Sequence, residues 1–125
     1  MVSFENLILK DGIPIYQQLI WYIKEGIVSG QIKNGDELPS RRFLSSLLGV
    51  NPNTVQKAFS LIETEGLILS HTGAKSCVNA TEERIARLRA ELLGMRAAEM
   101  VAAFKQMGLS REEAVSLIES TWEEE

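Results

Sequence analysis

The sequence predicts a mainly α-helical fold with one β-hairpin. Apolar residues recur at three- and four-residue spacing along five stretches, two of these stretches are separated by only two residues, and a short β-favouring run follows the second of that pair. The chain has 125 residues, of which 45% are apolar and 24% are charged. This length and composition suit one compact domain with a small appendage.

The first predicted helix covers residues 14–28. Pro14 suits the first helical position, and the following apolar residues share one face: Tyr16, Leu19, Ile20, Ile23 and Ile27. Segment 29–39 holds two glycines and ends in a proline, so we expect a connector there, with at most a short strand around Ile32.

Two short helices are predicted next, and they lie very close together in the chain. Ser40 is suited to cap the first of them, Gly49 to end it, Asn51 to cap the second, and Pro52 to occupy its first turn. The apolar stripe of the first is Phe43, Leu44, Leu47 and Leu48, and the inward face of the second is Val55, Ala58, Phe59 and Ile62. Helices joined this tightly cross steeply, which is the helix-turn-helix arrangement.

Residues 67–79 read as a β-hairpin, with β-favouring runs on both sides of a turn. A hairpin that follows a helix-turn-helix is a wing. We therefore predict a winged helix-turn-helix domain, with three helices and a β-hairpin wing, over residues 1–79.

Residues 80–125 are predicted to form a second domain of two helices. A long helix runs from Thr81 to about Met107, and another begins at Ser110, where Glu113 completes a capping box. Because the linker is so short, we expect the two helices to lie as an antiparallel hairpin.

The apolar surface of this tail is too wide for two helices to cover, so we expect a second copy of the chain to bury it. The tail is thus predicted to hold a homodimer. The predicted dimerisation residues are Leu88, Leu92, Met95, Met100, Phe104, Leu117, Ile118 and Trp122.

Charge is distributed unevenly along a chain whose net charge is −4. Residues 1–80 carry seven basic and seven acidic side chains, whereas residues 81–125 carry six basic and ten acidic ones. Residues 38–62 hold no Asp or Glu, but they include Arg41, Arg42 and Lys57. Such a local cationic surface suits contact with phosphates.

The face of the third predicted helix that lies opposite its apolar stripe is polar. It carries Asn53, Gln56, Lys57 and Ser60. In a helix-turn-helix the second helix enters the DNA major groove, where Asn and Gln can each pair with adenine through two hydrogen bonds. Asn51 and Thr54 are placed to cap the helix or to contact phosphates.

At this point the motifs support a comparison with a known family. Three stretches resemble the winged-helix DNA-binding domain of the GntR family of bacterial transcription regulators over about residues 10–79. They are "PIYQQLIWYIKEGIVSGQIKNGDELPS", "GVNPNTVQKAF" and "ETEGLI". The NPNTVQKA variant and the short two-helix tail resemble its YtrA subfamily. The resemblance implies a homodimer held by the C-terminal helices, binding a pseudo-palindromic operator and usually repressing an operon that often encodes an ABC transporter.

The resemblance also implies DNA contacts at particular residues. In the helix-turn-helix and the wing tip they are Arg42, Asn51, Asn53, Thr54, Gln56, His71 and Gly73. Pro52 and Gln56 stand where relatives often have arginines, so the operator sequence cannot be carried over. With Arg41 and Lys57 these residues form the candidate DNA-binding set.

Each candidate also has a simpler structural interpretation. Arg41 and Arg42 can be a solvated helix end, Asn51 a cap, and His71 a surface residue. A winged helix can also dock a partner protein without sequence-specific DNA binding, which is the alternative function. An exposed apolar patch on the third helix would favour that alternative.

Other function classes find little support in the sequence. The N-terminus has no signal-peptide or membrane-anchor pattern, so we expect a cytoplasmic protein. The chain has a single cysteine, Cys77, and a single histidine, His71, which excludes an intrachain disulfide and a closed zinc site. No catalytic residues occur at a spacing that indicates an enzyme, and no cofactor or metal is expected. We also expect no small-molecule effector site, because a tail of two helices encloses no cavity for one.

Overall fold

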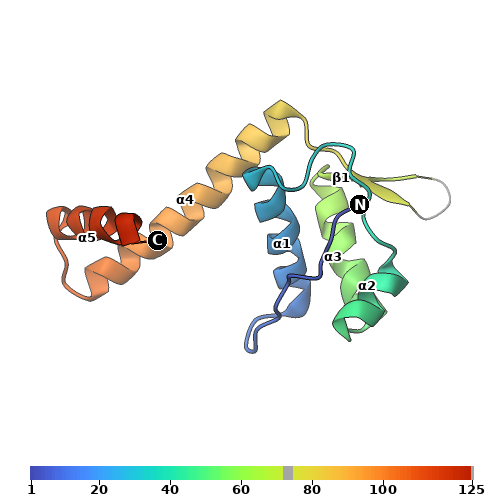
Figure 1. Ribbon diagram of the computed structural model, residues 1–125, viewed down its shortest axis with the longest axis horizontal. Helices are drawn as coiled ribbons and strands as arrows, with labels where there is room; N and C mark the ends of the chain where they lie inside the picture. The colour runs from blue at the N-terminus through green and yellow to red at the C-terminus, as the bar shows by residue number, and fades with distance from the viewer. Residues whose placement is uncertain (72–74, 125) are drawn as a thin grey trace. The chain divides into compact units, whose positions relative to one another are not determined.

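The computed structural model describes residues 1–71 and 75–124 of the chain. These residues form five helices and one two-stranded sheet, as Figure 1 shows. The elements are α1 (Ile15–Ser29), α2 (Arg41–Leu48), α3 (Pro52–Thr64), β1 (Ile68–Ser70), β2 (Ser76–Val78), α4 (Glu82–Gln106) and α5 (Arg111–Glu124). The predicted mainly helical class with a β-hairpin is confirmed.

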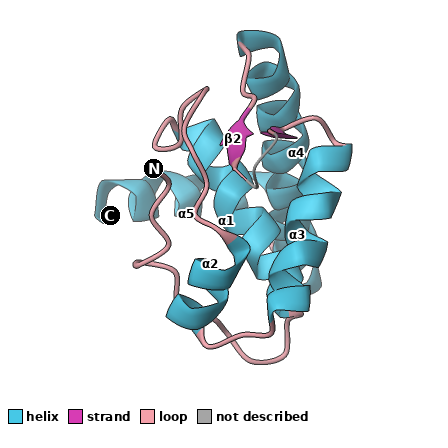
Figure 2. Ribbon diagram, turned by 90° about the vertical axis from the view of Figure 1, so that its right-hand side faces the viewer, coloured by secondary structure: helices cyan, strands magenta, loops and turns pink. Residues whose placement is uncertain are grey.

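The chain divides into two compact units, Met1–Arg89 and Ala90–Glu125. Helix α4 contributes residues to both units, because the division falls within it. In the first unit α3 is central, since it packs against α1, α2 and β1. Figure 2 shows the strands near the upper end of these helices.

The core of the first unit is made by the predicted inward faces of α1 and α3. Fully buried side chains include Leu19, Ile23, Ile27, Val55, Ala58, Phe59 and Ile62. Tyr16, which the spacing placed on the same face of α1, is only half-buried. The helical periodicity of both segments is therefore confirmed.

Local capping rules are confirmed at the helix-turn-helix. The hydroxyl of Ser40 accepts a hydrogen bond from the N–H of Phe43 at 3.1 Å, and the side chain of Asn51 accepts one from the N–H of Asn53 at 2.8 Å. Gly49 ends α2 with a φ of 68°, a left-handed conformation that glycine adopts without strain.

The apolar stripe predicted for α2 is only partly buried. Leu44 is fully buried, but Phe43 is 57% exposed and Leu47 is 42% exposed. Helix α2 has only eight residues, and its contact with α3 buries Leu44 and Ser45. Phe43 and Leu47 lie one turn apart at the edge of that contact, where they line a shallow groove with the N-terminal segment.

The N-terminal segment is part of the core, which no periodicity in the sequence predicted. Val2 and Phe4 are buried, and the Phe4 ring centroid lies 5.0 Å from that of Tyr22 in α1. The N–H of Val2 donates to the carbonyl of Glu37 at 2.8 Å. The first residues thus cover one side of α1 and the connector.

The segment between α1 and α2 is the expected connector, and it forms no strand around Ile32. Ile32 instead packs against Gly26 of α1, and its N–H donates to the Gly26 carbonyl at 2.9 Å. A Cβ at Gly26 would lie 2.4 Å from the end of the Ile32 side chain, so a larger residue here would force the buried Ile32 to shift. The connector then runs beside β2, where Glu37 and Cys77 form an isolated antiparallel bridge and the N–H of Leu38 donates to the Ser76 carbonyl at 2.9 Å.

The predicted wing is confirmed as an antiparallel pair. Ile68 lies opposite Val78, and Ser70 lies opposite Ser76. Val78 also accepts a hydrogen bond from the N–H of Gly35 at 2.8 Å, which ties the base of the wing to the connector.

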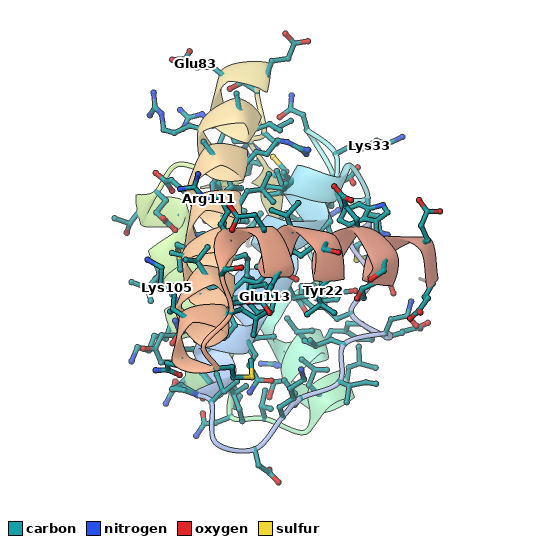
Figure 3. All side chains as sticks on the ribbon, turned by 90° about the vertical axis from the view of Figure 1, so that its left-hand side faces the viewer. Tyr22, Lys33, Glu83, Lys105, Arg111 and Glu113 are labelled. Carbon is teal, nitrogen blue, oxygen red and sulfur yellow. The ribbon has the colours of Figure 1, made fainter. Side chains whose placement is uncertain are left out.

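The second unit contains the end of α4 and all of α5. The predicted capping box is confirmed, because the N–H of Ser110 donates to the Glu113 carboxylate at 3.0 Å and the N–H of Glu113 donates to the Ser110 hydroxyl at 3.2 Å. The hydrogen bond from the Ser110 backbone, with a smaller contribution from its side chain, holds the pKa of Glu113 below its ordinary value. Figure 3 shows Glu113 at the beginning of α5.

The expected antiparallel arrangement of α4 and α5 is wrong in one respect. Both Figure 1 and Figure 3 show α5 running across the end of α4 rather than alongside it. The turn between them includes Gly108 with a φ of 81°. A short linker keeps two helices close but does not fix their crossing angle, and this pair does not pack along its length.

Candidate nucleic-acid interface

The exposed face of α3 carries the polar residues that the sequence placed there. Asn53, Gln56, Lys57 and Ser60 are all exposed, whereas Thr54 is half-buried. Gln56 donates a hydrogen bond from Nε2 to the Ser60 hydroxyl at 2.9 Å. A primary amide has two N–H donors and a carbonyl acceptor, so this bond leaves Gln56 with groups that can pair with a base edge.

Asn51 has a structural role in addition to any contact with DNA. Its side-chain oxygen caps the N–H of Asn53, and its carbonyl accepts from the N–H of Thr54 at 2.9 Å. These bonds satisfy N–H groups that the first turn of a helix leaves without intrahelical partners. The cap therefore fixes where α3 begins and which way Asn53 and Gln56 face.

The three cations of the acid-free stretch lie in different environments. Arg42 is exposed at the start of α2. The guanidinium carbon of Arg41 lies 5.5 Å from the ring centroid of Phe59, and its Nε is buried with no hydrogen-bond partner in the part of the chain that the structure describes. The ammonium of Lys57 lies 3.9 Å from the ring centroid of Tyr16. Sequence reasoning missed both aromatic partners, because neither is close in the sequence.

The described wing residues on either side of the turn, His71 and Lys75, are exposed. The Nε2 of the His71 ring lies 3.0 Å from the thiol sulfur of Cys77. The backbone N–H of His71 donates to the Lys75 carbonyl at 2.8 Å. Lys75, which was not among the candidates, adds a cation here and pairs with Glu37 at 3.9 Å. Gly73 lies outside the described residues.

The predicted dimerisation residues do not all share one environment. Leu88 is only 4% exposed and belongs to the core of the first unit, so it has no surface to offer a second copy. Leu92 and Phe104 are half-buried. The remaining candidates are exposed in the single chain: Met95, Met100, Leu117, Ile118 and Trp122.

Two apolar grooves of about 500 and 600 Å³ lie in the second unit, where α4 meets α5. Both are lined by Met100, Phe104 and Ile118. The larger one also includes Leu117 and Trp122. The unit therefore leaves a continuous apolar surface uncovered.

The surface of α3 bears on the alternative function. The whole of α3 is described, and Leu61 is its only exposed large apolar side chain. One leucine is not the apolar patch that docking of a partner protein would need. Across residues 1–71 and 75–124, no group of His, Cys, Asp and Glu is arranged to hold a metal, and no helix is long and apolar enough to span a membrane.

The family described as "Bacterial regulatory proteins, gntR family" matches residues 15–78, from the start of α1 to the end of the wing. The chain belongs to the GntR family. The matched stretch contains the whole helix-turn-helix and both strands of the wing, so the family assignment covers the elements that form the candidate interface.

Relatives of this GntR-family chain include two proteins of Bacillus subtilis (strain 168). The HTH-type transcriptional repressor YtrA is 46% identical over 47% of this chain, but that match spans only 45% of YtrA. The uncharacterized HTH-type transcriptional regulator YhcF is 30% identical over 86% of this chain and 88% of its own length. A solved GntR family transcriptional regulator from Listeria monocytogenes has a TM-score of 0.82 at 28% identity, over 90% of this chain and 98% of that one.

Proposed function

We propose that this protein is a dimeric, sequence-specific DNA-binding transcriptional regulator that represses its own operon. The proposal rests on how α3 is capped, buried on one face and exposed on the other. Its cap and buried apolar face fix the helix in the domain, its opposite face keeps Asn53, Gln56 and Lys57 exposed, and Arg42 is exposed at the start of α2. A helix held in this way can enter the major groove.

The proposed DNA contacts are of two kinds, contacts to phosphates and contacts to base edges. Arg42 and Lys57 bind backbone phosphates, which supply affinity without reading sequence. Asn53 and Gln56 read base edges, and adenine is the base that an amide recognises through two hydrogen bonds. In the wing, His71 approaches the neighbouring minor groove, and Lys75 adds a cation near it.

Dimerisation completes the proposed regulator. The exposed apolar residues of α4 and α5 associate with those of a second copy, because burial of apolar surface stabilises by about 25 cal/mol per Å². Two DNA-binding domains then meet two half-sites about one helical turn, or roughly 34 Å, apart in a pseudo-palindromic operator. The repressor role is proposed by analogy with the YtrA repressor, and the resemblance to its subfamily supports an operon that encodes an ABC transporter as the target.

A gel-shift series with DNA from the protein's own promoter region tests the proposal. We expect a specific complex whose association constant falls steeply with salt concentration, because phosphate contacts release counterions. The absence of a specific shift on every upstream fragment would contradict the proposal.

Two substitutions separate base reading from phosphate binding. Gln56→Ala should cost about 1–3 kcal/mol and relax one operator position, whereas Arg42→Ala should weaken binding to all sequences similarly. Gln106→Ala and Arg89→Ala, which remove the same side chains at exposed positions of α4, are matched controls. If Gln56→Ala and Arg42→Ala bind like the wild type, α3 is not the groove-binding helix.

A further inference from the structure

A contact between an aromatic ring and a cation joins α1 to α3 on the proposed DNA-binding surface. Tyr16 lies in the first turn of α1, and its ring centroid is 3.9 Å from the ammonium nitrogen of Lys57. Tyr16 is half-buried where α1 packs on α3, whereas Lys57 is exposed. None of the ion pairs seen in residues 1–71 and 75–124 involves Lys57. A ring, and not a carboxylate, holds this ammonium.

An aromatic ring is a more suitable partner than a carboxylate for an ammonium that binds phosphate. A carboxylate would cancel the positive charge and repel the DNA backbone. The face of an aromatic ring attracts an ammonium through its quadrupole but carries no net charge. The ammonium therefore keeps its full charge, and the donors that point away from the ring remain available.

The contact also limits the freedom of a flexible side chain. A lysine that moves freely in solution loses rotamer entropy when it grips a phosphate, which weakens binding. A lysine already held on a ring has lost part of that freedom before DNA arrives. The neighbouring stretch without Asp or Glu, residues 38–62, leaves no nearby carboxylate in the sequence to compete for it.

We propose that Tyr16 is a positioning residue for DNA binding, whose ring holds the Lys57 ammonium ready for a backbone phosphate beside α3. The inference rests on the proposed function and refines it, since it assigns Lys57 to a phosphate and gives α1 a part in binding. Tyr16 itself need not touch DNA.

The test uses the full chain and the duplex that the wild type binds, with salt titrations of four variants. Lys57→Ala removes one phosphate contact and should lower the salt slope by about one. Tyr16→Leu keeps the ammonium but removes the ring face, so Kd should rise about two- to fivefold with an unchanged salt slope. Tyr16→Phe keeps the ring and should bind like the wild type. The double variant Tyr16→Leu/Lys57→Ala should bind no more weakly than Lys57→Ala.

A spectroscopic measurement separates positioning from a general packing role. In the DNA-free chain, the ring current of Tyr16 should shift the ε-methylene proton signals of Lys57 upfield, and this shift should persist in Tyr16→Phe and vanish in Tyr16→Leu. Signals at unshifted positions in the wild type would overturn the inference.

Two binding results would also overturn it: wild-type affinity in Tyr16→Leu, or a loss that adds fully to that of Lys57→Ala, as a packing defect would. Failure of the proposed function has a different signature, because the wild type would then show no specific complex while the ring-current shift remained.

Discussion

The two units of the chain differ in how they treat apolar surface. In the first unit, residues of α1 and α3 cover one another so completely that Leu19, Ile23, Val55 and Ile62 have no exposed surface. In the second unit, no side chain among described residues 90–124 is buried, and Trp122 is 78% exposed. The sequence pattern does not explain this difference in burial, since both units carry apolar residues at helical spacing.

The first unit thus buries its apolar faces within itself, whereas the second unit leaves its apolar faces exposed in the single chain. A helix with an apolar face is stable in a globular protein only when another element covers that face. Helix α3 has α1, α2 and β1 as partners, whereas α5 crosses α4 and leaves both apolar faces open. We therefore propose that the first unit recognises DNA and that the second unit associates with a second copy of the chain.

The largest expected effect is on association. Trp122→Ala should weaken dimerisation by about 2–4 kcal/mol, because a large exposed aromatic side chain in an apolar patch is typical of an interface hot spot. It should leave the unfolding of the first unit unchanged, since Trp122 is exposed in the single chain. Sedimentation velocity over a concentration series measures the effect, with Glu123→Ala as the neighbouring control. Equal dimer affinity in both variants would remove Trp122 from the interface.

A pair of glycine substitutions tests the contrast between the units directly. Gly26→Ala in α1 would push a methyl group against buried Ile32, and we expect a loss of about 1–3 kcal/mol in the free energy of unfolding. Gly94→Ala in α4 meets nothing within 4 Å, so the better helix former should stabilise that helix by up to about 1 kcal/mol. Urea unfolding of the two variants measures both signs, and equal effects would contradict the contrast.

The smallest effect concerns the cap of α5. Because the Glu113 pKa is lowered by its bonds to Ser110, the ionised cap stabilises α5 above the ordinary carboxyl pKa. This stabilisation should fade as the pH falls through the lowered pKa. Ser110→Ala should raise the Glu113 pKa, as measured by NMR titration of the carboxyl carbon. Glu113→Gln, which can still cap but cannot titrate, should remove the acid dependence of amide exchange at the start of α5.

Features that depend on neighbours in the chain could be predicted from the sequence. The caps at Ser40, Asn51 and Ser110 involve residues two or three positions away, and all three predicted caps are confirmed. The inward face of α3 was also correct, because a thirteen-residue amphipathic helix has only one apolar side to bury.

Features that depend on distant partners could not be predicted in the same way. Phe43 and Leu47 fit the stripe of α2, but periodicity does not say which apolar residues find a partner. Val2 and Phe4 are buried in an extended segment that has no period to recognise. The ring that holds Lys57 comes from another helix, so only the fold brings the two together. The candidate DNA contacts remain predictions.

The most direct test of the account is the mass of the full chain in solution. Sedimentation equilibrium at micromolar concentration should give twice the chain mass of 13.9 kDa, because the open apolar faces of α4 and α5 should be covered by a second copy. A mass of 13.9 kDa at every concentration up to tens of micromolar would contradict the account, because the second unit would then stand uncovered and the two half-sites would have no dimer to bind them.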